Sequence, residues 1–99
     1  MQEESPFRVV WSRKAIDVLK GHGPAVAPAG SGQALAKIIE DLDRRLRTDP
    51  GTVGEVYRSR GVVVEHVAVH EFVAIDFAID LERRLVLVRT CRVWAESGF

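Results

Sequence analysis

The sequence has little that would crosslink the chain or hold it in a membrane. It contains one cysteine, Cys91, in 99 residues, so neither an internal disulfide nor a cysteine-based zinc site can form. The expected location is therefore a reducing cytoplasm. Its uninterrupted apolar runs are only a few residues long, which excludes a membrane-spanning helix. Residues 1–5 are acidic and no apolar segment follows them, so we expect no signal peptide.

An excess of positive charge is also missing. Fourteen lysines and arginines balance fourteen acidic residues, giving a formal net charge of zero. Proteins that bind nucleic acid through its phosphates usually carry a basic excess, so this balance argues against that role. Hydrophobic residues make up 46% and charged residues 28% of the chain. This composition predicts one globular domain over residues 1–99.

Metal-binding patterns are equally scarce. His66 and His70 are four positions apart within a segment rich in valine, which predicts a strand. Positions four apart on a strand lie about 13 Å apart, too far to share one ion. We therefore expect solvent-facing or partner-facing histidines, and neither a metal ion nor a cofactor. The lone Cys91 is expected to be a buried, unreactive thiol.

The first half of the chain predicts a strand followed by two helices. Residues 7–11 alternate as a strand does, and Ser12 is suited to cap a helix that ends before Gly21. Residues 22–32 are rich in glycine and proline and predict a loop. A second helix then starts near Ser31 and stops at proline 50. Its apolar stripe consists of Leu35, Ile38, Ile39, Leu42 and Leu46.

The second half changes to the two-residue period of strands. Residues 62–69, 72–79 and 85–94 predict three strands joined by short turns, and therefore an antiparallel meander. On the middle strand the predicted buried residues are Val73, Ile75, Phe77 and Ile79. The expected fold is α+β: an N-terminal strand, two helices, and a three-stranded antiparallel meander with the helices packed on one face.

The order of these elements, with particular residues, resembles the RelE/ParE superfamily of toxins from bacterial type II toxin–antitoxin pairs, especially the ParE-like, plasmid-stabilisation type. The first strand ends in the aromatic Trp11, and the long second helix ends at Leu46 and the Asp49-Pro50 stop. Gly54-Glu55 with Arg58 is similar to the family's junction before the second strand. The closing hairpin, residues 73–80 and 84–93, is similar to the family's ending. The likeness covers about residues 7–94, which the resemblance implies as the core of the domain.

The resemblance implies two kinds of activity, cleavage of messenger RNA on the ribosome or poisoning of DNA gyrase. RNA-cutting members use basic residues and a tyrosine on the open face of the sheet. Glu65 and Val67 stand where those members have lysines, and Val73 stands where they have an arginine. No tyrosine follows Arg92, because Tyr57 is the only tyrosine. The candidate catalytic residues that remain are Arg58, Arg89 and Arg92.

We therefore predict a toxin-like protein that acts by binding a target, gyrase or another non-nucleolytic one, and that a cognate antitoxin neutralises. One alternative is a ribosome-dependent messenger RNA endoribonuclease. Another is a non-toxic α+β interaction module that forms a homodimer through an edge strand. The predicted partner-binding residues are Asp76, Arg89, Arg92 and Trp94. A plain cross-strand ion pair between Asp76 and Arg89 is the alternative for that pair.

Overall fold

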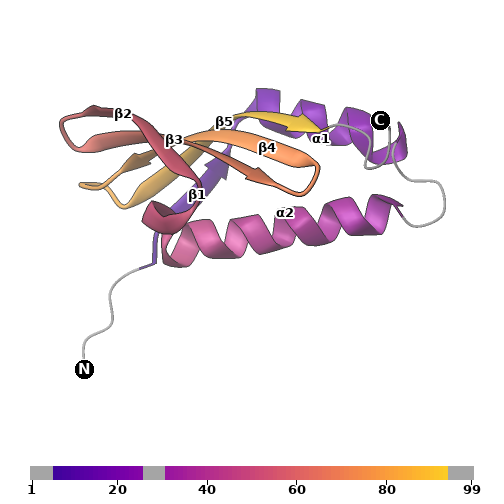
Figure 1. The fold of residues 1–99 in the computed structure, drawn as a ribbon, viewed down its shortest axis with the longest axis horizontal. Helices are drawn as coiled ribbons and strands as arrows, with labels where there is room; N and C mark the ends of the chain where they lie inside the picture. Colours follow the sequence, from indigo (N-terminus) through magenta and orange to yellow (C-terminus); the bar gives the residue numbers. More distant parts are fainter. Residues whose placement is uncertain (1–5, 26–30, 94–99) are drawn as a thin grey trace.

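The protein forms a five-stranded mixed sheet with two helices (Figure 1). The computed structural model describes residues 6–25 and 31–93. The elements in chain order are β1 (Arg8–Trp11), α1 (Arg13–Ala25), α2 (Ser31–Thr48), the short 3-10 helix η2 (Pro50–Thr52), β2 (Glu55–Arg60), β3 (Val63–His70), β4 (Val73–Asp80) and β5 (Leu85–Val93). The strand order is β1-β5-β4-β3-β2. β1 runs parallel to β5, and every other neighbouring pair is antiparallel.

The predicted three-stranded meander was wrong in one respect, because β2 adds a fourth antiparallel strand to it. All six residues of β2 are exposed, so the segment has no alternation of buried and exposed positions to indicate a strand. Its place at the sheet edge depends on backbone pairing with β3. The α+β class and the other three strands of the meander are confirmed, with boundaries within a residue or so of those expected.

α1 continues the path of β1 along β5. β1 pairs with Leu85–Val88, and α1 then lies beside the remaining part of β5 (Figure 1). Ser12 makes this junction, since its hydroxyl accepts the Ala15 N–H at 3.0 Å and donates to the Arg89 carbonyl at 2.8 Å. The cap predicted at Ser12 is thus confirmed. The predicted end before Gly21 was wrong, because a helical glycine costs only about 1 kcal/mol relative to alanine and the helix runs on to Ala25.

α2 supplies the apolar layer that covers one face of the sheet (Figure 1). Four residues of its predicted stripe are buried and Ile39 is half-buried. The β4 alternation is confirmed, since the four residues predicted to face the core are all buried. Trp11 fastens β1 to α2, because its indole Nε1 donates to Asp43 Oδ1 at 3.0 Å. None of the described helices is long and apolar enough to cross a membrane.

Candidate functional site

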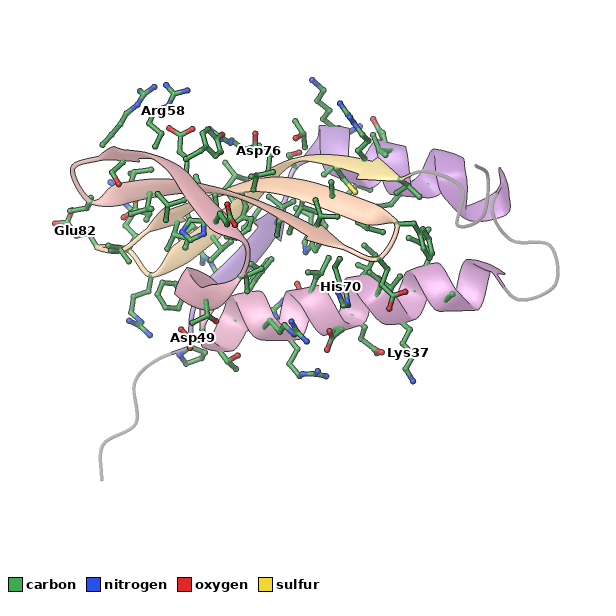
Figure 2. The ribbon with its side chains drawn as sticks, in the orientation of Figure 1. Lys37, Asp49, Arg58, His70, Asp76 and Glu82 are labelled. Atoms are coloured by element: carbon green, nitrogen blue, oxygen red, sulfur yellow. The ribbon has the colours of Figure 1, made fainter. Side chains whose placement is uncertain are left out.

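The opposite, open face of the sheet carries a cluster of four polar side chains from four strands. Tyr57, Glu65, Asp76 and Arg89, called the charge cluster below, come from β2, β3, β4 and β5. Figure 2 shows Asp76 on the side of the sheet away from α2, with Arg58 above the β2 end of that face. The cluster therefore lies on the surface that the helices leave uncovered.

Two irregularities of strand pairing bring the cluster together. On β2 the register shifts between Val56 and Arg58, so Tyr57 is the extra residue opposite β3. On β5 the register with β4 shifts so that Arg89 is extra, between Val88 and Thr90. A β-bulge re-aims the side chain of the extra residue. Both bulged residues reach the open face, where Glu65 and Asp76 already point because they alternate with core residues.

Arg89 is at the centre of the charge cluster. Its Nη2 lies 2.7 Å from Asp76 Oδ1, 2.8 Å from Glu65 Oε1 and 2.7 Å from the Tyr57 hydroxyl oxygen. The Tyr57 hydroxyl also lies 3.0 Å from Asp76 Oδ1 and 3.2 Å from Glu65 Oε1, so it donates its proton to a carboxylate. Two carboxylates therefore share the charge of one arginine. Hydrogen bonds of this charged kind are shorter and stronger than neutral ones.

The surroundings of each group set its protonation state. The hydrogen bond from Arg89 holds the pKa of Glu65 below its ordinary value of 4.5. Burial, and then the hydrogen bond to Asp76, raise the pKa of Tyr57 above 10.0. Hydrogen bonds to Asp76 and Glu65 raise the pKa of Arg89 further above its ordinary range. At neutral pH, Glu65 is therefore an anion, Tyr57 is neutral and Arg89 is a cation.

This arrangement is better suited to holding the sheet face in one shape than to moving protons. A general base works best with a pKa near the working pH. The shift at Glu65 moves its pKa away from neutrality on the acid side, and the shift at Tyr57 moves its pKa away on the basic side. Arg58 and Arg60 add their Nε atoms 3.7 and 3.6 Å from Glu65 Oε2. Glu65 is thus a shared anchor for three arginines.

The structure brings together some of the predicted site residues and separates others. Asp76 and Arg89 meet in the cross-strand ion pair that the sequence offered as one interpretation. Arg58 is at the exposed edge of the cluster, beside Glu65. Arg92 is exposed and pairs in register with Ala74, outside the cluster. Trp94 lies outside the described residues.

Tyr57 and Glu65 are the members that the sequence did not predict. Glu65 points to the face opposite His66, which faces the core. The sequence signal that could have indicated them is the single tyrosine, Tyr57, eight residues before Glu65. Their contact, however, depends on the bulge in β2.

The expected solvent exposure of the histidines was wrong for His66. This residue is buried, its Nδ1 lies 3.0 Å from the Val53 carbonyl oxygen, and its ring stacks on Phe77 with centroids 5.0 Å apart. The imidazole can face the core because its polar nitrogen finds a backbone partner there. His70 is half-buried, with Nε2 3.5 Å from Asp41 Oδ2 of α2.

Cys91 and the possible metal ligands are further groups that could carry chemistry. Within residues 6–25 and 31–93, no three His, Cys, Asp or Glu side chains are grouped to hold a metal ion. The expected absence of a metal or cofactor stays a prediction, which elemental analysis of the tag-free protein can test. Cys91 is buried, and burial raises the pKa of its thiol to about 11. The predicted burial of this thiol is confirmed, and its lack of reactivity stays a prediction.

The charge cluster predicts a specific loss of stability in acid. Because the folded state lowers the pKa of Glu65, this residue stabilises the fold above its unfolded pKa, and that contribution is lost as the pH falls through the folded pKa. Between about pH 6 and pH 3, the free energy of unfolding of the wild type should therefore fall more steeply than that of Glu65→Gln. Urea denaturation at a series of pH values measures both slopes. Asp80, whose pKa is also lowered, is common to both proteins. Parallel slopes would contradict the role given to Glu65.

Comparisons with known proteins identify the fold. No family model and no curated protein matches the sequence. One similar solved chain belongs to the toxin–antitoxin complex RelBE2 from Mycobacterium tuberculosis, with a TM-score of 0.67 and 20% identity over 96% of this chain and 99% of that one. Another belongs to the archaeal RelE–RelB complex from Pyrococcus horikoshii, with a TM-score of 0.61 and 8% identity over 94% and 98% of the two chains. The chain therefore has the RelE fold, and the resemblance drawn from the sequence is confirmed at that level.

Proposed function

We propose that this protein is the toxin of a toxin–antitoxin pair, neutralised by a partner protein encoded beside it. The observation that carries the proposal is the similarity, over nearly the whole chain, to two chains that were each solved in a RelE–RelB type complex. The match leaves almost no residue of either protein outside the shared fold, so the surfaces that such partners use have counterparts here. A fold alone does not assign an activity, so the activity has to be argued from the side chains of the site.

We further propose that the toxin acts by binding a target, as a gyrase-directed protein would, and does not cut RNA. The charge cluster supports this, because its central cation, Arg89, is already bonded to two carboxylates. Cleavage by a 2′-hydroxyl needs a base, an acid and cations that are available to the phosphate. Glu65 also pairs with Arg58 and Arg60, so it competes with a phosphate for these two cations.

Controlled expression tests the toxin role directly. We expect induction of this protein alone to slow the growth of a bacterial host, and co-induction with the neighbouring reading frame to restore it. The physical reason is that the antitoxin covers the surface that binds the target. The matched control is the same plasmid with a stop codon early in the gene. Normal growth under induction, with soluble protein present, would leave the chain as a non-toxic interaction module.

An assay on translating ribosomes tests the mechanism. We expect no defined cuts in the messenger RNA after incubation with purified protein, because the pKa shifts of Glu65 and Tyr57 both lead away from neutral pH. Primer extension on the recovered RNA reads the result. Cuts that disappear in Arg92→Ala or Arg89→Ala would overturn the non-nucleolytic proposal.

One observation favours the ribonuclease alternative and makes that assay necessary. Tyr57 and Arg89 are in direct contact on the open face, at 2.7 Å, although they are far apart in the sequence. A tyrosine and an arginine on this face are the residue types that the resemblance implies for RNA cleavage. If cuts occur, Tyr57→Phe should reduce their rate strongly, because it removes the only phenol of the chain.

A further inference from the structure

A hollow beside the charge cluster is the second polar feature of the open face. It lies between the start of α1 and the strands β3, β4 and β5. Its lining includes Lys14, Val67, Ala74, Asp76, Thr90 and Arg92. We call it the cationic hollow, because Lys14 and Arg92 contribute its two exposed positive charges.

The two cations of the hollow differ from Arg89 in having no carboxylate partner. Among the described residues, neither Lys14 nor Arg92 makes an ion pair, whereas Arg89 makes two. Asp76, the acidic residue in the lining, is bonded instead to Arg89 and Tyr57. The carboxylate of Asp76 is therefore already engaged within the charge cluster, and the hollow next to it has two positive charges to offer.

The position of Lys14 relative to Arg92 is fixed by the junction of β1 and α1. The Ser12 N–H donates to the Val88 carbonyl at 2.9 Å, and its hydroxyl donates to the Arg89 carbonyl at 2.8 Å. These bonds fasten the first turn of α1 to β5. Both cations are thus presented from rigid elements, and a ligand between them does not have to order a loop.

Apolar side chains lie beside the two cations. Val67 and Ala74 are part of the lining, and Val69 pairs in register with Ala74 on the same face. The side chains of Val67 and Val69 are 43% and 65% exposed. A ligand that fills the hollow gains the most binding free energy if it carries an apolar side chain next to an anionic one.

We infer that the cationic hollow binds an acidic side chain of the antitoxin, between Lys14 and Arg92, while a neighbouring apolar side chain of the antitoxin packs on Val67 and Val69. This inference rests on the proposed function. A nucleic-acid backbone suits the place less well, because two cations beside an apolar patch and Asp76 give little attraction for a chain of phosphates. The described charges favour a protein ligand with both kinds of side chain.

Calorimetric titration of the purified product of the neighbouring reading frame tests the inference. The variants are Lys14→Glu and Arg92→Glu, and the matched control is Arg13→Glu, which reverses a charge that is adjacent to Lys14 and also exposed but lies outside the hollow. We expect Kd to rise about tenfold for each variant in the hollow and to change less than about twofold for the control. Circular dichroism and thermal melts confirm that all three variants are folded.

The outcomes separate the inference from the proposed function. Equal changes in Kd for Arg13→Glu and the two hollow variants would overturn the inference and leave the toxin–antitoxin role intact. No binding by the wild type would overturn the proposed function, and the inference with it. A parallel titration uses a labelled single-stranded RNA. If Lys14→Glu and Arg92→Glu weaken RNA binding and not partner binding, the hollow binds phosphate and the inference is wrong.

Discussion

Replacement of Phe77 with alanine is expected to lower the free energy of unfolding by about 3–5 kcal/mol. Phe77 is fully buried in β4, with a relative exposure of 0%, and its ring stacks on that of His66. The change removes most of a large aromatic side chain from the middle of the sheet, and the surrounding strands can collapse only partly into the space. Native proteins have about 5–15 kcal/mol of stability in total, so this loss removes a large part of it.

Urea denaturation followed by circular dichroism measures this loss. Val69→Ala on the neighbouring strand is the control, because 65% of the Val69 side chain is exposed. We expect that control to change stability by less than about 0.5 kcal/mol. Similar losses for Phe77→Ala and Val69→Ala would contradict the placement of the core between α2 and β4.

Replacement of Gly54 with alanine is expected to be nearly as damaging, at about 3 kcal/mol. Gly54 has a φ of +68°, a conformation that strains any side chain, and a Cβ there would lie 2.2 Å from the Val67 carbonyl oxygen and 2.6 Å from Ala68 Cβ. The first of these contacts is with backbone, so the start of β2 would have to move away from β3. Because β2 carries Tyr57, we also expect the charge cluster to be disturbed.

Gly51 provides the matched control for this substitution. It lies three residues earlier, has no positive φ, and nothing is within 4 Å of a Cβ built on it. Gly51→Ala should therefore leave stability unchanged or raise it by up to about 1 kcal/mol, through the lower entropy of the unfolded chain. Both variants can be compared by thermal melting. A Gly54→Ala protein as stable as Gly51→Ala would contradict the close approach of β2 and β3.

The edge strand β2 contributes both to the stability of the sheet and to the open face that a partner would bind. β2 is an edge strand with every residue exposed, and edge strands offer unpaired backbone groups to a partner. The charge cluster pins this strand to β3, β4 and β5 through Tyr57. A partner that binds the open face therefore meets a surface that is already rigid.

The sequence by itself determined those parts of the protein that local periodicity records. The stripe of α2, the alternation along β4 and the cap at Ser12 each follow from side chains within a few residues of one another. The ion pair between Asp76 and Arg89 could be anticipated because consecutive antiparallel strands must lie side by side.

Only the tertiary structure decided the rest. β2 is held by backbone pairing and by the Tyr57 hydroxyl at an edge where all its residues are exposed, so no hydrophobic pattern marks it. His66 is buried because the carbonyl of Val53, thirteen residues away, satisfies its ring nitrogen. The charge cluster depends on two bulges, at Tyr57 and Arg89, and a one-residue shift of register turns a side chain to the other face. Such shifts are set by the summed packing of four strands, and no single segment of the sequence contains that information.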